Sequence, residues 1–392
     1  MNTIALNSAT RLQGDLERIL GQLVDDGYEL GVQAAVYLRG ELVADVCVGT
    51  VSSHSSLSVQ PDTVFPVCST GKGILATLAH ILAERGVIDY IAPVADYWPE
   101  FGVNGKAAIT VAQAMSHQAG IPTPPVFVSL DEACDFDAAC ARVAQLTPEW
   151  TPGSTMQYHS RSWGWIVGGL IRHATGTPIG QLLRDEITGP LGTAGEMFFG
   201  ITEEADKRYS AFEPQPTQRA QITTAPSSHE PPPPTAIDAL KLPLNDFVNL
   251  PQVRRCCMPA VNGIMSARAI AKHYAALIGE VDGVRLVSSE RLALATTRVT
   301  REGTTPECFG HGFGLGYCLK GPAGDMGAFF GHGGAGGSEG MANRRLGMAL
   351  GMVKNRMDTH SNAPDHTNLL MIRAIYDVLG HEGDGGFYGV KG

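Results

Sequence analysis

The 392-residue sequence predicts an α+β fold, in which an antiparallel β-sheet built from both chain ends is flanked by helices and accompanied by a mostly helical lobe. Three observations lead to this prediction. Strand-like alternation begins near residue 31, helical spacing of apolar residues follows from residue 69, and strand-like segments return near residue 313. A sheet that uses both termini, with the helical region inserted between them, is the simplest arrangement of these elements.

The first expected elements are a β-hairpin and a helix. Apolar residues alternate over residues 31–50 on both sides of a break at Arg39-Gly40, which is typical of a hairpin. Over residues 69–85 the apolar side chains recur at helical spacing, and Gly86 follows as a residue suited to end the helix.

The middle of the chain reads as mainly helical, with helices expected at residues 162–174 and 267–278. Residues 213–236 contain seven prolines and cannot sustain helical or sheet hydrogen bonding, so we expect an extended surface loop there. The last expected elements are strands at 313–319, 327–331 and 346–353 and a helix at 363–379.

These elements form a single catalytic unit over residues 1–392 in our interpretation. Its sheet-containing lobe comprises about residues 10–68 and 260–385, and its mostly helical lobe comprises about residues 69–259.

The composition argues against several classes of partner. The net charge is −10 and no cluster of lysine and arginine stands out, which argues against nucleic acid and against an anionic membrane. No secretory signal is visible in the first residues, and no apolar stretch reaches the length of a membrane span of about 18 residues. The eight cysteines lack metal-ligand spacing, and Cys256 and Cys257 are adjacent. We therefore expect mostly reduced, buried cysteines and a cytoplasmic protein.

Ser69 and Lys72 are the first candidate catalytic pair. A serine hydroxyl is a poor nucleophile and needs a base within hydrogen-bond reach, and residues three apart share one face of a helix. Burial in a cleft would lower the pKa of Lys72, and its neutral amine would then accept the serine proton. The apolar lead at residues 64–67 places Ser69 at a helix N-terminus, where backbone N–H groups favour developing negative charge.

Further segments accompany this pair along the chain. They are Met115 to Ile121 around His117, Trp150-Thr151-Pro152-Gly153, Tyr158-His159-Ser160, and Phe330 to Gly337 with the triplet His332-Gly333-Gly334.

With these segments the sequence resembles the serine β-lactamase and penicillin-binding-protein superfamily, which includes class C β-lactamases, serine DD-peptidases and family VIII carboxylesterases. The family has three ordered motifs, S-x-x-K, Y-x-N or Y-x-S, and [K/H/W]-x-G. They match Ser69-x-x-Lys72, Tyr158-x-Ser160 and His332-x-Gly334. The segment around His117 and Asn262-Gly263 also match, and the resemblance spans about residues 10 to 380.

The resemblance implies a β-lactamase/transpeptidase-like fold and a role for each site residue. Ser69 is implied as the nucleophile that forms the acyl-enzyme, and Lys72 as the group that helps to deprotonate it. Tyr158 is implied as a general base in acylation and as the activator of the deacylating water. The oxyanion hole would be the backbone N–H groups of Ser69 and Ala335, with Gly334 allowing a close approach to the substrate. The resemblance implies no cofactor and no metal.

Two departures from the family pattern bear on the substrate. Ser160 stands where β-lactamases of this type have Asn, and His332 stands where penicillin-recognising enzymes usually have Lys. That lysine helps to bind the carboxylate of the antibiotic, whereas His332 as a neutral donor suits an uncharged ester. We therefore expect a serine hydrolase that cleaves a small-molecule carboxylic ester through an acyl-Ser69 intermediate.

Other functions stay open at this point. The same acyl-enzyme would serve an acyltransferase that uses an alcohol acceptor, or an amide or β-lactam hydrolase. A non-catalytic binding protein is disfavoured because all three motifs are intact. The sequence leaves the acyl group, the alcohol and the oligomeric state open.

Ser338 lies in a second, competing motif. Gly336 to Gly340 matches the G-x-S-x-G pattern of α/β-hydrolases, but that turn should follow a strand and open a helix, with an acid and a histidine downstream. Only 54 residues remain after Ser338 and the glycine-rich context indicates a loop, so we expect no nucleophile there. The histidines near the chain end have no metal-ligand spacing and are expected at the surface: His360, His366 and His381.

Overall fold

A seven-stranded sheet dominates the computed structural model, which describes residues 3–214, 242–299, 312–321, 328–357 and 367–379. Its strand order is β2-β1-β11-β10-β9-β8-β7, and every neighbouring pair is antiparallel. The strands are β1 (Gly31–Leu38), β2 (Glu41–Gly49), β7 (Gly312–Phe313), β8 (Cys318–Lys320), β9 (Phe329–Gly333), β10 (Glu339–Asn343) and β11 (Met348–Lys354). Both ends of the chain build this sheet, and the predicted α+β fold is confirmed.

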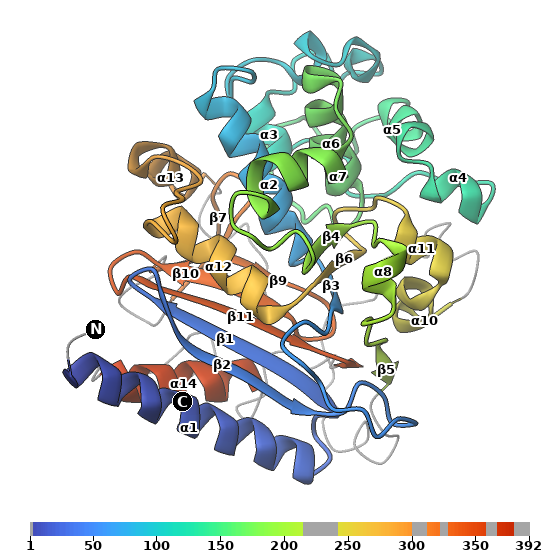
Figure 1. Cartoon of the computed structure of the whole chain (residues 1–392). Helices are drawn as coiled ribbons and strands as arrows, with labels where there is room; N and C mark the ends of the chain where they lie inside the picture. Colours follow the sequence, from blue (N-terminus) through green and yellow to red (C-terminus); the bar gives the residue numbers. More distant parts are fainter. Residues whose placement is uncertain (1–2, 215–241, 300–311, 322–327, 358–366, 380–392) are drawn as a thin grey trace.

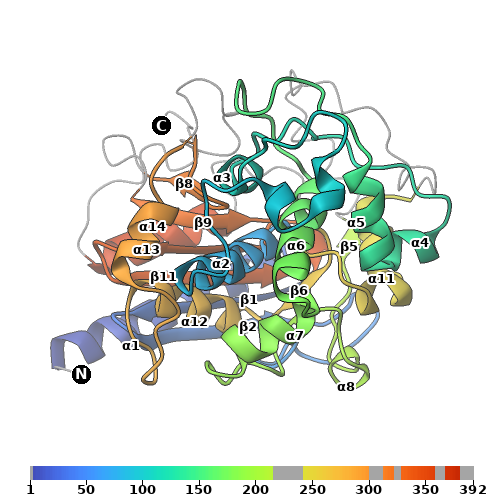
Figure 2. The same ribbon diagram turned by 90° about the horizontal axis from the view of Figure 1, so that it is seen from above.

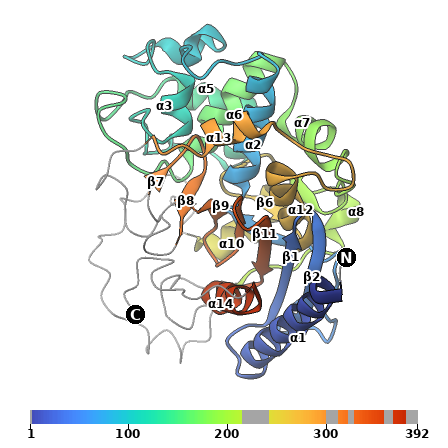
Figure 3. The same ribbon diagram turned by 90° about the vertical axis from the view of Figure 1, so that its left-hand side faces the viewer.

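Helices cover both faces of the sheet (Figures 1 and 3). On one face lie α1 (Thr3–Asp25) and α14 (Thr367–Leu379), which contact each other. On the other face lie α12 (Ala267–Ile278), which contacts β1, β10 and β11, and α2 (Gly71–Glu84), which contacts β9. The sheet is thus the middle layer of three.

The alternation of side chains along β1 explains how one strand serves both layers. Val32, Ala34 and Val36 belong to the apolar cluster around α1 and α14, whereas Ala35 and Tyr37 belong to the larger cluster on the opposite face. All five are buried, so β1 contributes side chains to the apolar core on both faces of the sheet.

Three predicted helices are present. The helix expected over residues 69–85 is α2, and Gly86 follows it with a φ of +72°. The other two are α6 (Ser162–Thr175) and α12, whose Ser266 side chain caps the helix by accepting a hydrogen bond from the N–H of Ala269 at 3.1 Å. Helix α2 lies between α6 and the main sheet and contacts both (Figure 2), so its surface is buried on nearly every side.

Short helices make up much of the remaining structure between β2 and β7. They are α3 (Val111–Met115), α4 (Leu130–Cys134), α5 (Phe136–Ala144), α7 (Ile179–Leu183), α8 (Glu203–Asp206), α10 (Leu244–Asn249), α11 (Pro251–Arg255) and α13 (Ser289–Ala295). A small antiparallel sheet joins β3 (Phe65–Cys68), β6 (Gly263–Met265) and β4 (Met197–Phe199), in that order. Within the described residues, no helix combines the length and the apolar character that crossing a bilayer requires.

The sequence-based prediction differs from the structure in several elements. The strand expected at residues 313–319 is two short strands, β7 and β8, because the chain turns at Gly316 with a φ of +83°. Strand β10 was not predicted, since the glycine-rich segment before it indicated a loop. Helix α1 was missed as well, although its leucines recur at helical spacing and are buried: Leu12, Leu16, Leu20 and Leu23.

The proline-rich segment begins with a strand pair that we did not expect. β5 (Glu213–Pro214) pairs in parallel with β12 (Arg356–Met357), and the N–H of Glu213 donates to the carbonyl of Asn355 at 2.7 Å. Pro214 has no N–H to donate, which suits the end of a strand. The rest of the predicted loop, residues 215–236, lies outside the described residues, as do residues 363–366 of the predicted last helix.

Candidate active site

Ser69 lies in a tight turn between β3 and α2. Cys68 has a φ of +45°, a left-handed conformation that is rare for a residue with a side chain. This bend ends the strand, and the N–H of Thr70 then donates to the carbonyl of Val67 at 3.1 Å. Cys68 and Thr70 are buried, whereas Ser69 is partly exposed. The local fold therefore presents the serine side chain to the outside of an otherwise buried turn.

Lys72 lies one helical turn further on and is fully buried. Its amine nitrogen Nζ is 2.8 Å from Ser69 Oγ and 3.2 Å from the carbonyl oxygen of Ala260. Burial lowers the pKa of Lys72 from 10.5 to about 7, because a charged amine loses its hydration there. An amine with such a pKa exchanges protons readily near neutral pH, and its nearest side-chain partner is the serine hydroxyl.

Aromatic side chains surround this pair. Lys72 Nζ lies 5.0 Å from the centre of the Tyr158 ring, and the Tyr158 hydroxyl lies 3.5 Å from Nε2 of His332. The ring of Phe313 stacks on Tyr158 with 6.1 Å between ring centres. The structure therefore brings together Ser69, Lys72, Tyr158 and His332, which the sequence placed in three separate motifs.

The hydrogen bonds of His332 correct one expectation. Burial, followed by the charge of Lys72, lowers the pKa of His332 well below 6.5, so its imidazole is neutral. Nδ1 lies 2.7 Å from the carbonyl oxygen of Gly333, which can only accept, so Nδ1 carries the single proton. Nε2 then has no proton, and its lone pair faces the Tyr158 hydroxyl. His332 is an acceptor toward the site, not the neutral donor that we expected.

The chain after His332 approaches the Ser69 turn closely. A Cβ atom at Gly334 would lie 2.1 Å from the carbonyl oxygen of Val67 and 3.0 Å from Oγ1 of Thr70, so only glycine fits. Ala335 follows directly and is exposed. In the part of the chain that the structure describes, the backbone N–H groups of Ser69 and Ala335 have no hydrogen-bond acceptor. Both N–H groups can therefore donate to a bound molecule.

Ser338 occupies a different environment. Its hydroxyl is buried, donates to the carbonyl of Val67 at 2.8 Å and lies 3.0 Å from Oγ1 of Thr70. It lies between β9 and β10, not between a strand and a helix. These contacts tie the segment after His332 to the Ser69 turn.

Ser160 is not brought into this group. It is exposed in the turn before α6, and among the described residues it forms no hydrogen bond with Ser69, Lys72 or Tyr158. The described residues also contain no group of three or more His, Cys, Asp or Glu side chains that could hold a metal. The late histidines lie outside the described residues: His360, His366 and His381.

Two neighbours of the site were missed as site residues. The first is Ala260, whose carbonyl contacts Lys72. Its loop is held by the Asn262 side chain, which accepts from the N–H of Met258 at 2.9 Å and donates to the carbonyl of Cys256 at 2.7 Å. The second is His117, whose ring lies 4.7 Å from that of Tyr158. His117 and Asn262, which holds the Ala260 loop, both belong to segments that match the family motifs. That match was the signal in the sequence that could have identified these neighbours.

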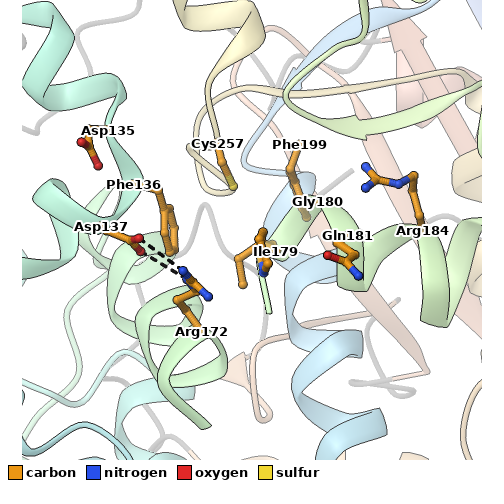
Figure 4. A pocket seen from close by; sticks show the side chains of 11 residues that line it. Asp135, Phe136, Asp137, Arg172, Ile179, Gly180, Gln181, Arg184, Phe199 and Cys257 are labelled. Atoms are coloured by element: carbon orange, nitrogen blue, oxygen red, sulfur yellow. Dashed lines mark hydrogen bonds and ion pairs between the residues drawn. The ribbon is translucent and has the colours of Figure 1, made fainter. Parts of the chain in front are cut away.

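A cavity of about 360 Å³ lies apart from these residues, among α5, α6, α7 and β4 (Figure 4). Arg172 and Arg184 line it together with apolar side chains such as Phe136, and Arg172 pairs with Asp137 at 3.3 Å. None of the candidate catalytic residues lines this cavity.

A serine at the start of a buried helix, with a buried lysine one turn later and a tyrosine across from it, on this three-layered fold, is typical of the serine β-lactamase and penicillin-binding-protein class. The family model described as Beta-lactamase matches residues 16–373, and the chain belongs to that family.

Individual relatives include esterases and a penicillin-binding-protein homologue. The chain is 34% identical over 368 residues to the esterase/beta-lactamase LipL of Mycobacterium tuberculosis (strain ATCC 25618 / H37Rv), covering 89% of this chain and 82% of LipL. The structure of a family VIII carboxylesterase superimposes with a TM-score of 0.81 at 31% identity, over 94% of this chain and 97% of that one. A penicillin-binding-protein homologue from Caulobacter crescentus gives a TM-score of 0.78 at 29% identity, over 94% and 97%.

Proposed function

We propose that the protein is a serine hydrolase of the carboxylesterase type, which cleaves a small-molecule ester through an acyl intermediate on Ser69. One observation carries this proposal: Ser69 Oγ lies 2.8 Å from the amine of Lys72, whose pKa burial lowers to about 7. A nucleophile is thereby paired with a base that is partly neutral at physiological pH. The esterase relatives support the choice of an ester as substrate.

The proposed reaction has two steps. In the first, Lys72 accepts the proton of Ser69 while Oγ attacks the ester carbonyl, and the N–H groups of Ser69 and Ala335 stabilise the oxyanion. The alcohol leaves with that proton, and the acyl group stays on Ser69. In the second, Tyr158 helps to activate a water, which releases the carboxylic acid and restores the serine. We assign both Tyr158 and Lys72 to the proton transfers, and the amine lies 5.0 Å from the centre of the tyrosine ring.

A neutral substrate fits the charges around the third motif. His332 is neutral and directs a lone pair, not a positive charge, toward the site. The lysine on the adjacent strand, Lys320, forms a buried ion pair with Glu339 at 2.9 Å. We therefore expect short-chain p-nitrophenyl esters to be cleaved readily and the anionic β-lactam nitrocefin to be cleaved slowly or not at all.

A substrate panel tests this proposal. Purified protein is assayed with p-nitrophenyl acetate and butyrate, nitrocefin and a D-amino-acid amide, and intact-mass spectrometry records any acyl-enzyme. A kcat/KM for nitrocefin that equals or exceeds that for p-nitrophenyl butyrate would overturn the esterase assignment. Hydrolysis of the amide without hydrolysis of the esters would do the same.

A labelling experiment tests the nucleophile. Ser69→Ala should abolish turnover and labelling by a fluorophosphonate probe, because the covalent bond then has no oxygen to form on. The matched control is Ser338→Ala, which should keep the label. Attachment of the probe to Ser338 in the wild-type protein would show that the proposed mechanism is wrong.

We also propose that the protein works in the cytoplasm, without nucleic acid and without a membrane. The net charge of −10 supports this, as do the cysteines, because all seven that the structure describes are free thiols. Three of them are buried and four are partly exposed, so fewer are buried than we expected. Cell fractionation with an antibody against the protein would test the location.

A further inference from the structure

His117 occupies a backbone position that favours glycine. It follows α3, whose C-cap is Ser116, and has a φ of +61°. The N–H of Gln118 donates to the carbonyl of Gln113 at 2.9 Å, which is the hydrogen bond that closes a helix end through a left-handed residue. Glycine is usual at this position because it has no Cβ to clash. A strained residue with a large side chain points to a use for that side chain.

The hydrogen bonds of His117 lie on both sides of Tyr158. The backbone N–H of Gln157 donates to the carbonyl of His117 at 3.3 Å, and the backbone N–H of His159 donates to Nδ1 of the His117 ring at 3.1 Å. In the chain, Tyr158 lies between these two donor residues, in a stretch that forms no helix or strand. No sheet or helix hydrogen bonds therefore hold its backbone in place.

The His117 ring also supports the Tyr158 side chain directly. It is 1% exposed, and its centre lies 4.7 Å from that of Tyr158. Phe313 meets the His117 ring edge-on at 4.8 Å, and Trp163 packs 5.8 Å away. The imidazole thus fills the space behind Tyr158, on the inside of the protein.

We propose that His117 is a positioning residue that holds Tyr158 beside Lys72, through the hydrogen bond from His159 to its Nδ1 and through the packing of its ring. The inference rests on the role that the proposed function gives to Tyr158. In this role His117 acts through Tyr158 and not on the reacting atoms. It fixes the position of Tyr158, which takes part in the proposed proton transfers.

The electrostatic surroundings keep Nδ1 able to accept. Burial lowers the pKa of His117 well below 6.5, and the titratable groups that face it, His159, Lys72 and His332, lower it further. The ring therefore stays neutral wherever the enzyme is active, and the hydrogen bond from His159 persists.

Two substitutions separate the acceptor from the backbone conformation. Asn and Gly both tolerate a positive φ, so neither His117→Asn nor His117→Gly strains the chain. The side-chain oxygen of Asn can take the place of Nδ1, whereas Gly removes both acceptor and ring. We expect His117→Gly to lower kcat for p-nitrophenyl acetate by about 100-fold with little change in KM, as small misplacements do. His117→Asn should recover most of that loss.

A double-mutant cycle tests whether the effect passes through Tyr158. Tyr158→Phe alone should lower kcat strongly, and adding His117→Gly to it should cost much less than in the wild type. His117→Gln is a second variant. The glutamine amide would reach the position of Nε2 and not that of Nδ1, so it could not accept the hydrogen bond from His159. We therefore expect the Gln variant to have a kcat as low as that of the Gly variant. His80→Asn is the control for losing a buried histidine, since its ring contacts Tyr90 and the carbonyl of Leu315. It should leave kcat unchanged.

The outcomes distinguish the two proposals. A folded His117→Gly or His117→Gln variant with wild-type kcat would overturn the positioning role. Equal kcat in the Asn and Gln variants, or a full loss from His117→Gly in the Tyr158→Phe background, would overturn it as well. Near-wild-type activity of Tyr158→Phe would instead remove Tyr158 from the mechanism, and the positioning role with it. Circular dichroism and thermal melting show which variants are folded.

Discussion

At the scale of single residues, the chemistry depends on a lysine held where a charge is costly. Lys72 is enclosed completely, and its polar partners are a serine hydroxyl and the Ala260 carbonyl, neither of which carries a charge. The coulombic contributions of Cys68 and Cys318 favour the charged amine, but desolvation outweighs them and the pKa falls to about 7. The same burial that makes Lys72 unfavourable for folding makes it a base.

A pH profile follows from this pKa. Below about pH 7 the amine is protonated and cannot accept the serine proton, so kcat/KM for p-nitrophenyl acetate should rise through about pH 7 and level off above it. The folded pKa lies below the unfolded value of 10.5, so the unfolded chain binds more protons between these two values. Stability should therefore also rise with pH in that window.

Rates at subsaturating ester from about pH 5.5 to 9.5 measure the profile. His332→Gln is the control, because a limb that persists in this variant does not come from the histidine. A flat profile across this range, or a rate that falls as the pH rises through 7, would contradict the assignment of Lys72 as the base.

At the scale of elements, the site depends on how closely one strand end approaches a helix start. The chain after β9 touches the turn before α2, where Ser338 donates to the carbonyl of Val67 and Gly334 leaves no room for a Cβ. This contact holds the segment that carries Ala335 against the turn that carries Ser69. The oxyanion donors that we propose thus come from the junction of two elements, each held by buried hydrogen bonds.

Gly334→Ala should break this junction. The added methyl group would lie 2.1 Å from the carbonyl of Val67 and must push the two segments apart. Losing one oxyanion donor costs about 100- to 1,000-fold in kcat, so we expect a loss of that order in ester hydrolysis. Gly14→Ala is the matched control, because Gly14 lies in α1 with open space around its Cβ position, and alanine there should keep activity and add up to about 1 kcal/mol of stability. Equal activity of both variants would contradict the proposed hole.

At the scale of the whole molecule, the sheet separates stability from chemistry. Helix α2, which begins two residues after Ser69, lies on one face of the sheet, and α1 with α14 lies on the other (Figure 1). Two separate apolar clusters fill the two interfaces, so a defect in the α1 layer is separated from the active site by the sheet.

Leu16→Ala tests this separation. Leu16 is fully buried in the cluster around α1, and its truncation should cost about 2–5 kcal/mol of unfolding free energy by leaving a cavity. Below its melting temperature the variant should keep the wild-type kcat. Urea denaturation and the ester assay measure both quantities, and Leu57→Ala is the control, since Leu57 is 69% exposed. A large loss of kcat in folded Leu16→Ala would show that the layers are coupled.

The sequence by itself determined the elements whose signal is local. The alternation around Arg39-Gly40 produced the hairpin, and helical spacing predicted α6 and α12 to within one residue at each end. The motif order also indicated which side chains belong together, because each motif is contiguous in the chain. Strand β10 was not predicted, because its pairing with β9 and β11 depends on the rest of the sheet and not on the glycine-rich sequence around it.

Only the tertiary structure decided what each site residue does to its neighbours. The carbonyl of Gly333 turns His332 into an acceptor, and a buried hydrogen bond to Val67 engages the Ser338 hydroxyl. Ser160, although part of a motif, lies exposed, whereas His117 is buried against the ring of Tyr158. Burial, proton placement and contact distance are properties of segments that meet across the fold. A pattern read along one segment therefore identifies the groups, but their pKa values and hydrogen-bond directions arise where the segments pack.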